Sequence, residues 1–338
     1  MTMRACICEE PGRLVLAERP AAVRGPGEVL LAPLRIGLCG TDYHIMRGTQ
    51  PYLSYPRVMG HELAAEVIES DEDGTFAPGV LVCVLPYLFC GTCRACRRGR
   101  ENCCRNLSVL GVHRDGGLTD RLSLPARYLI DATGLSPDQA AMVEFLSVGR
   151  HAVERAAPAV GDRALVVGAG PIGMAVALFA SRRGAEVTVL DGNARRAQFC
   201  VDQLGATRAV LLGEDSETQL AEATGGEGFD AVFDATGSPA AMAAGFARVG
   251  HGGCYVLVSV VSATISFDDP EFHKRETTLL GSRNATRADF AAVVAAIRAG
   301  EVPTAAMHTH SASLADLPAR MDEWMDPSSG VIKAIVTP

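Results

Sequence analysis

Residues 164–173 read A-L-V-V-G-A-G-P-I-G, an apolar run that leads directly into G-x-G-x-x-G. This pattern predicts a buried strand, a glycine-rich turn and a helix whose N-terminus attracts a pyrophosphate. The first glycine permits the tight turn, the second lets the backbone approach the phosphates, and the third lets helix and strand pack closely. The stretch therefore predicts a dinucleotide site made by Gly168, Gly170, Pro171, Ile172 and Gly173.

The next apolar run, A-E-V-T-V-L-D, ends at Asp191, eighteen residues beyond Gly173. An acidic side chain there can accept hydrogen bonds from both hydroxyls of the adenosine ribose, and it repels a 2′-phosphate. Arg195 and Arg196 follow closely and leave NADP open as the alternative. We expect NAD, with Arg196 among the cofactor-binding residues.

Strand-like and helix-like segments alternate from about residue 151, which is typical of an α/β domain with a doubly wound parallel sheet. Residues 1 to about 145 instead contain short β-like runs broken by Gly and Pro. A chain of 338 residues exceeds what one core usually organises. We predict a β-rich domain from residues 1–150 and 285–338, whose last strand comes from G-V-I-K-A-I-V-T-P, and a nucleotide-binding domain from residues 151–284.

The charge balance argues against several classes of partner. With 31 basic and 39 acidic side chains the formal charge is −8, so nucleic acid and anionic membrane surfaces are not expected to bind. The N-terminal segment has acidic residues where a signal peptide needs apolar ones, and no long uncharged apolar window is present. We expect a cytoplasmic protein that acts on a small molecule.

Eleven cysteines are present, and five of them lie between residues 90 and 104. Four have the spacing C-x2-C-x2-C-x7-C, which is typical of a structural zinc site closed by four thiolates. The lobe spans about residues 88–106, and its ligands are Cys90, Cys93, Cys96 and Cys104, with Cys103 competing for the last place. An iron–sulfur cluster is the alternative occupant. The cysteines in apolar contexts are expected to be buried small side chains: Cys6, Cys8, Cys83, Cys200 and Cys254.

A second group of possible ligands is dispersed along the chain: Cys39, the adjacent His61 and Glu62, and Glu144. Nothing in their spacing brings these residues together.

Taken in order, the motifs resemble the zinc-containing medium-chain dehydrogenases, and more closely their sorbitol and threonine dehydrogenase-like branch. The resemblance covers essentially the whole chain. It is carried by G-P-G-E-V (25–29), C-G-T-D-Y-H (39–44), G-H-E (60–62), the cysteine lobe, E-x-L-S-V-G-x-H-A (144–152), G-A-G-P-I-G (168–173) and D-A-T-G (234–237).

The resemblance implies a GroES-like catalytic domain joined to a Rossmann domain, with two zinc ions and one NAD per chain. It favours Cys104 over Cys103 in the lobe and assigns a catalytic zinc to Cys39, His61 and Glu62 or Glu144. That zinc would lower the pKa of a secondary alcohol, and hydride would pass to the nicotinamide. The branch ordinarily has proline after this glutamate, whereas Phe145 follows Glu144 here.

Proton transfer in this family pattern passes from Thr41 through the nicotinamide ribose to His44. Thr236 in D-A-T-G is a further predicted cofactor residue. Arg283 in G-S-R-N could face either the cofactor or the substrate, and we assign it to the cofactor side.

Three stretches are similar to a subgroup that oxidises sugar acids such as L-galactonate or L-gulonate at C5: residues 50–62, 102–117 and 281–286. A sugar acid needs a cation to hold its carboxylate. Arg57 and Arg114 are the predicted substrate residues, with Arg47 and His113 nearby. A neutral polyol is the nearest alternative substrate, and threonine or an amino-cyclitol is a more distant one. Two non-enzymatic functions also stay open, an NAD-binding sensor and an interaction protein built on the zinc lobe.

Apolar edge strands tend to pair with a second copy, so we expect a homodimer or homotetramer. The segment C-Y-V-L-V-S-V-V at residues 254–261 is the predicted edge.

Overall fold

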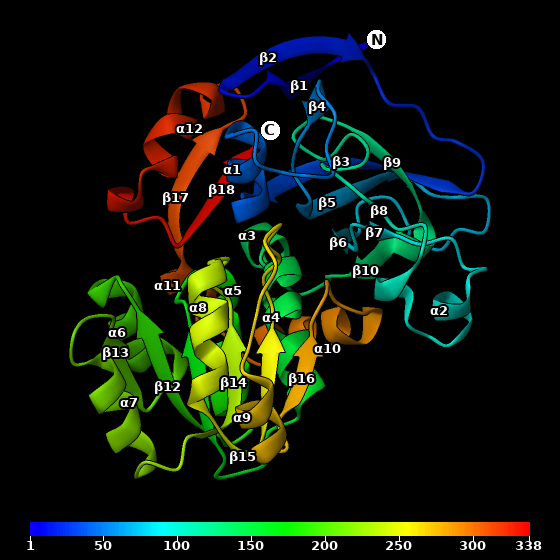
Figure 1. Ribbon diagram of the computed structural model, residues 1–338. Coiled ribbons are helices and arrows are strands. Elements are labelled where there is room, and N and C mark those ends of the chain that lie inside the picture. The colour runs from blue at the N-terminus through cyan, green and yellow to red at the C-terminus, as the bar shows by residue number, and fades with distance from the viewer. The chain divides into compact units, whose positions relative to one another are not determined.

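Six parallel strands form the sheet of the nucleotide-binding part, in the order β13-β12-β11-β14-β15-β16 (Figure 1). The order reverses between β11 and β14, which is the doubly wound arrangement expected of a Rossmann sheet. The strands are β11 (Arg163–Val167), β12 (Glu186–Asp191), β13 (Arg208–Leu211), β14 (Phe229–Asp234), β15 (Val249–Leu257) and β16 (Thr278–Gly281).

Helices connect these strands, and α5, α6, α7 and α8 pack on the sheet. The core includes Leu165, Leu190, Val232 and Tyr255, all at most 2% exposed. The helices are α4 (Val143–Ala156), α5 (Pro171–Arg182), α6 (Ala194–Leu204), α7 (Ser216–Thr224), α8 (Pro239–Gly245) and α9 (Asp269–Lys274), with a short 3₁₀ turn at Phe246–Arg248.

The predicted edge strand is not at an edge. β15 pairs with β14 on one side and with β16 on the other, so the two edges of this sheet are β13 and β16. The apolar character of residues 254–257 reflects burial inside the sheet, because Tyr255 and Val256 are fully buried.

The remaining residues form a β-rich unit of three sheets. The largest has the order β10-β6-β5-β3-β18-β17, with β9 also paired to β3; a second is β2-β1-β4 and the third is β7-β8. The strands are β1 (Thr2–Glu10), β2 (Arg13–Pro20), β3 (Glu28–Gly37), β4 (Arg57–Val58), β5 (Glu62–Glu69), β6 (Leu81–Val84), β7 (Tyr87–Leu88), β8 (Ser108–Val109), β9 (Leu122–Pro125), β10 (Leu129–Asp131), β17 (His308–Ser313) and β18 (Lys333–Thr337).

Short helices complete this unit. They are α1 (Gly40–Met46), α2 (Arg94–Arg97), α3 (Pro137–Ala141), α10 (Arg287–Arg298), α11 (Thr304–Met307) and α12 (Leu317–Met325), with 3₁₀ turns at Glu101–Cys103, Ala126–Tyr128 and Pro327–Ser329. The strand expected at the end of the chain is β18, which pairs with β3 and so returns to the first part of the sequence.

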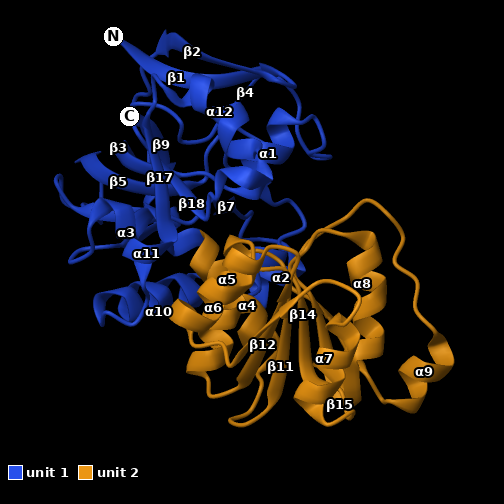
Figure 2. Ribbon diagram, turned by 90° about the vertical axis from the view of Figure 1, so that its left-hand side faces the viewer, with its two compact units in different colours: residues 1–144, 286–338 blue, residues 145–285 orange.

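The computed structural model describes residues 1–338 as two compact units, residues 1–144 with 286–338 and residues 145–285 (Figure 2). The boundary between residues 144 and 145 falls inside α4, six residues before the boundary expected at 150. It lies there because most of α4 packs on α5 and so belongs to the nucleotide-binding unit. A side chain at Gly149 would meet Ala175 of α5 at 2.4 Å, so the glycine permits that close contact. None of the helices combines the length and hydropathy needed to span a membrane.

Candidate metal and cofactor sites

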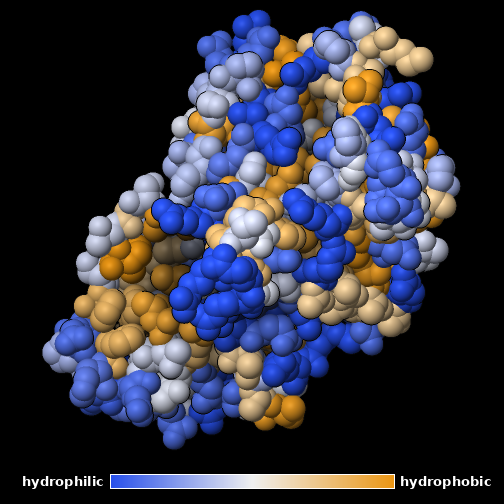
Figure 3. Space-filling model, turned by 90° about the vertical axis from the view of Figure 1, so that its right-hand side faces the viewer, coloured by the Kyte–Doolittle hydropathy of each residue, from blue (hydrophilic) through white to orange (hydrophobic).

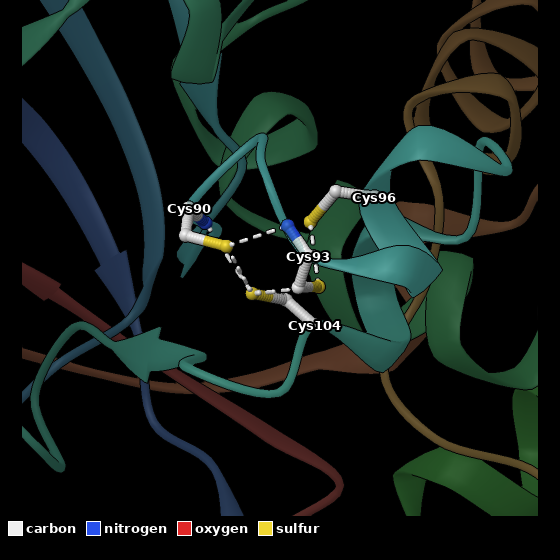
Figure 4. Close-up of side chains that lie close together, drawn as sticks. All are labelled: Cys90, Cys93, Cys96 and Cys104. Carbon is white, nitrogen blue, oxygen red and sulfur yellow. Dashed lines mark hydrogen bonds between the residues drawn. The ribbon is translucent and has the colours of Figure 1, made fainter.

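Four cysteines converge in the lobe between β7 and β8. The Sγ atoms of Cys90, Cys93, Cys96 and Cys104 all lie within 4.8 Å of one another, and the neighbouring pairs are 3.5, 3.5 and 4.0 Å apart (Figure 4). Thiolates bound at about 2.3 Å to one tetrahedral zinc ion are about 3.8 Å apart. All eleven cysteines are free. The spacing therefore fits a single ion, whereas a multi-iron cluster would hold its thiolates further apart because they bind different irons.

Backbone N–H groups in the lobe donate to two of the four sulfurs. The backbone N–H of Cys93 donates to Cys90 Sγ at 3.4 Å, and those of Cys90 and Asn106 donate to Cys104 Sγ at 3.3 Å. The Thr92 hydroxyl and the backbone N–H groups of Thr92 and Cys93 lower the pKa of Cys90 to about 6. A lowered pKa favours the form of the side chain that binds metal.

The two adjacent cysteines have different environments. Cys104 is 2% exposed and belongs to the four-sulfur group, while Cys103 is exposed and outside it. Since the chain turns between them, only one can face the other three sulfurs.

We predict that Cys104→Ser removes the lobe metal and lowers the thermal midpoint of unfolding, because a buried thiolate ligand is lost. Elemental mass spectrometry should show bound zinc falling from about two to about one ion per chain. The matched control, Cys103→Ser, should keep both the zinc content and the midpoint. Loss of zinc in the control instead would assign the fourth place to Cys103.

A second donor set forms where β3, α1 and β5 meet. Atoms of Cys39, His61 and Glu62 lie within 4.8 Å of one another. The antiparallel ladder of β3 and β5 pairs Gly37 with Glu62, which brings Cys39, two residues after Gly37, beside the His61–Glu62 pair. A side chain at Gly37 would lie 2.2 Å from Glu62 Oε2, so the glycine leaves room for the carboxylate.

The donor chemistry of this set suits zinc. A thiolate, an imidazole and a carboxylate are its usual ligands, and three protein ligands with an open fourth position are typical of a catalytic zinc. His61 is 5% exposed, Glu62 is fully buried, and His61 Nδ1 has no hydrogen-bond partner. Leaving a buried imidazole nitrogen without a partner costs free energy. A bound metal ion would supply a partner.

Two residues that the sequence analysis did not single out hold this set in place. Asp42, fully buried, accepts hydrogen bonds from the backbone N–H groups of Cys39 at 2.9 Å and Gly60 at 3.2 Å. Burial raises the pKa of Asp42, and the nearby charge of His61 opposes that shift. Asp42 therefore ties the loop before α1 to the loop before β5.

The second residue is Lys333, whose Nζ lies 2.7 and 2.8 Å from the two carboxylate oxygens of Glu62 and 3.0 Å from the Leu38 carbonyl. The side chains of Lys333 and Glu62 are 1% and 0% exposed. The sequence contains one signal for the role of Lys333: it stands within an otherwise apolar terminal run. A lysine in such a run is expected to be buried, and buried lysines are almost always paired with an acidic group.

Glu144 lies beside this set but outside it. It is in the first turn of α4, is 5% exposed, and accepts a hydrogen bond from the hydroxyl of Tyr87. Burial raises the pKa of Glu144 to about 7, while the charge of His61 opposes the shift. Of the two carboxylates left open by the sequence, the structure groups Glu62 with Cys39 and His61. Phe145 lies in the first turn of α4, and the helix continues without interruption to Ala156.

The predicted proton-transfer residues share one helix. Thr41 and His44 are both on α1, three residues apart, so they lie on the same helical face. His44 Nδ1 is 3.0 Å from Thr49 Oγ1. Partial burial and the charge of Arg47 lower the pKa of His44, which favours its neutral, proton-accepting form near pH 7.

In the nucleotide-binding unit the glycine-rich loop has the geometry that the motif requires. Gly168 has φ +95°, and a side chain at Gly173 would lie 1.7 Å from the Gly168 carbonyl oxygen. Gly170 precedes α5 and has open space where a side chain would be, as a backbone that faces a ligand needs. Asp191 accepts hydrogen bonds of 2.6 Å from the N–H groups of Ala169 and Asn193. It thus fixes the loop while lying at the end of β12.

The other predicted cofactor residues lie in this same unit. Arg196 is in the first turn of α6, where its N–H donates to the capping Asn193 side chain at 3.2 Å. Thr236 is exposed after β14, and its hydroxyl donates to buried Asp234 at 2.8 Å. Arg283 is exposed just beyond β16.

We predict that Gly173→Ala weakens both folding and cofactor binding, because the added methyl meets a backbone carbonyl that cannot rotate away. The helix propensity of alanine contributes about 1 kcal/mol in the other direction, so the net loss of stability should be about 1–3 kcal/mol. Gly170→Ala is the matched control for folding: it should unfold at the wild-type urea concentration yet bind NADH at least about tenfold more weakly, about 1.4 kcal/mol. Fluorescence titration measures the binding, and equal affinities for all three proteins would contradict the assignment.

The predicted substrate cations have different environments. Arg57 is 14% exposed and bonded to Asp115 at 3.3 Å and to Ser54, and Arg19 shares the same aspartate, so the guanidinium of Arg57 is engaged by the fold. Arg114 is exposed.

The comparisons with known proteins agree with this geometry. Residues 25–134 match the alcohol dehydrogenase GroES-like domain, and residues 171–299 match the zinc-binding dehydrogenase domain. The chain is 40% identical over 337 residues to L-galactonate-5-dehydrogenase of Escherichia coli (strain K12), covering 99% of both chains. It is 33% identical to 2-dehydro-3-deoxy-L-galactonate 5-dehydrogenase of Pseudoalteromonas atlantica, covering 92% of this chain and 91% of that one. Among solved structures, an alcohol dehydrogenase of E. coli CFT073 complexed with NADH superposes with a TM-score of 0.92 at 25% identity, over 100% and 99% of the chains.

Proposed function

We propose that this chain, which belongs to the family of zinc-type alcohol dehydrogenases, oxidises a secondary hydroxyl group of a sugar acid with NAD as the hydride acceptor. Membership of the family makes it an oxidoreductase that uses zinc and a nicotinamide cofactor. The observation that carries the proposal is the buried donor set of Cys39, His61 and Glu62 in a chain that also has a complete dinucleotide loop.

The residues of the candidate metal sites each have a specific role in this reaction. A bound zinc ion acts as a Lewis acid that makes the substrate hydroxyl more acidic. Cys39, His61 and Glu62 would hold that ion, and Asp42 and Lys333 hold the ligands. Thr41 would accept the hydroxyl proton and pass it toward His44, whose lowered pKa leaves its ring able to receive it. The four-cysteine lobe would hold a second zinc in a closed, structural shell.

The sugar-acid substrate is supported by a relative and by one exposed arginine. The E. coli relative at 40% identity is an L-galactonate dehydrogenase, and this chain has an exposed Arg114 in the stretch that resembles the sugar-acid subgroup. A guanidinium can bind a carboxylate through two parallel hydrogen bonds. The engagement of Arg57 by Asp115 leaves Arg114 as the substrate cation of the predicted pair.

NAD is favoured over NADP because Asp191 stands at the end of β12, where a 2′-phosphate would meet its carboxylate. The aspartate is held there by two backbone N–H groups, so it has little freedom to move aside. A cytoplasmic location stays a prediction, supported by eleven cysteines of which none forms a disulfide.

The test is NADH formation, followed at 340 nm, with L-galactonate, L-gulonate, sorbitol and threonine, each with NAD and with NADP. We expect the two acids to react with NAD. Arg114→Gln should raise KM for the acids about 10- to 100-fold, because glutamine lacks the charge and keeps at most one of the two hydrogen bonds, and should leave a slow reaction with sorbitol unchanged. Equal rates with acids and neutral polyols would reject the sugar-acid class, and bound NAD without any reduction would favour a sensor.

We also expect a homo-oligomer. Because β15 is not an edge strand, the expected interface is formed by β16. Leu279 on this edge strand is 38% exposed, and the neighbouring segment forms an apolar pocket of about 450 Å³ lined by Phe246, Phe267 and Phe272. Hydrophobic residues also gather beside a hollow on one face of the molecule (Figure 3). An unpaired apolar edge of this kind tends to pair with another chain.

Leu279→Lys should therefore convert the oligomer to single chains in sedimentation velocity. Leu211→Lys is the matched control, because Leu211 is 50% exposed on β13, the opposite edge of the same sheet. If the control dissociates while Leu279→Lys stays associated, the interface lies on β13.

A further inference from the structure

Two carboxylates are near the candidate catalytic metal, but only one belongs to the set of close ligand atoms. Glu62 is grouped with Cys39 and His61, whereas Glu144 is not. Glu144 is nevertheless near enough for the charges of His61 and Glu62 to act on it. If its side chain moved into the set, Glu144 would be a fourth protein ligand.

A fourth protein ligand would matter for the chemistry. Catalytic zinc sites keep three protein ligands and one position for water or substrate, while a fourth protein ligand gives the closed shell of a structural site. Whatever holds Glu144 away from the set therefore keeps the metal accessible.

The group in contact with Glu144 is the Tyr87 hydroxyl, which donates to Glu144 Oε1 in a buried environment. Tyr87 and Glu144 are only 3% and 5% exposed, so water does not compete for this hydrogen bond. A carboxylate that already accepts such a bond loses it on moving to a metal, and a buried hydroxyl without a partner costs about 1–3 kcal/mol.

Tyr87 itself is fixed by its surroundings. It lies on β7, which pairs with β8 in the register Tyr87 to Val109, and the Leu110 N–H donates to the Pro86 carbonyl at 3.0 Å. Its ring packs edge-on against Phe290 of α10, with centroids 6.3 Å apart and an interplanar angle of 84°. The backbone ladder and the ring contact fix the position of the Tyr87 hydroxyl, so the hydrogen bond fixes the position of the Glu144 carboxylate.

We propose that Tyr87 is a positioning residue whose hydroxyl holds Glu144 outside the Cys39–His61–Glu62 set and so keeps one coordination position open. This inference rests on the proposed function only in taking that set to be the zinc site. It does not depend on which alcohol is the substrate.

The experiment uses the whole protein loaded with Co²⁺, without NAD or substrate, and compares Tyr87→Phe with the wild type by visible absorption. Phenylalanine keeps the ring and removes the hydroxyl. In Tyr87→Phe, Glu144 should bind the metal in the open position in place of water, so the cobalt bands should shift as a carboxylate oxygen replaces the water ligand. Removal of the metal by a chelator should slow about tenfold, within the range known for groups that orient metal ligands. The lobe contributes equally to all the spectra, so differences report the Cys39 set.

Glu144→Gln and the double variant complete the cycle. With Tyr87 present, Glu144→Gln should keep the wild-type cobalt spectrum, and in Tyr87→Phe it should restore that spectrum. A purely structural role for Tyr87 would not be reversed by a change at Glu144. For activity, Tyr87→Phe should lower kcat about tenfold or more and leave NADH affinity unchanged, because only the metal position is blocked.

Two results would overturn the proposal: a Tyr87→Phe spectrum identical to that of the wild type, or a changed spectrum and faster metal loss in Glu144→Gln alone, which would make Glu144 a resident ligand. Absence of cobalt from the Cys39 set in the wild type would instead overturn the zinc site of the proposed function, and the inference with it. Failure of all the sugar acids as substrates leaves the spectral comparison intact.

Discussion

The buried ion pair of Lys333 and Glu62 is the interaction on which the candidate catalytic site depends. Its two residues are 271 positions apart in the sequence and at most 1% exposed. Transferring each charge from water costs several kcal/mol, which only close pairing and further hydrogen bonds offset. The pair satisfies this condition because the ammonium contacts both carboxylate oxygens and a backbone carbonyl.

The pair also joins the last strand of the chain to its first part. β18 pairs with β3 at Gly37, and β3 pairs with β5 at Glu62, so the terminal strand brings Lys333 to the carboxylate. The nucleotide-binding unit is inserted between the first and last parts of the chain. Residues 1–144 contain all three donors, but without β18 the Glu62 carboxylate would lack the cation that holds it.

The three ligand sites show three grades of dependence on tertiary structure. The four cysteines of the lobe lie within fifteen residues, and a short turn of helix with one loop is enough to bring their sulfurs together. The glycine loop is equally local, although Asp191 reaches it from the next strand. The donor set of Cys39, His61 and Glu62 depends on the pairing of two strands; of its two supports, Asp42 lies three residues after Cys39, whereas Lys333 comes from the last strand of the unit.

The sequence by itself determined the α/β class, the Rossmann order of strands and helices, the cofactor loop and the cysteine lobe. Each depends on residues that are close along the chain, where spacing translates directly into geometry. The dispersed ligands were grouped only through a resemblance to a family, because spacing gives no distance between Cys39 and Glu62. Only the tertiary structure showed that Glu62, and not Glu144, is grouped with Cys39 and His61. It also showed that Arg57 pairs with Asp115 and that the edge strand of the sheet is β16 rather than β15. Those outcomes depend on strand register and on which charged groups meet in the interior, and neither is encoded in any short stretch of sequence.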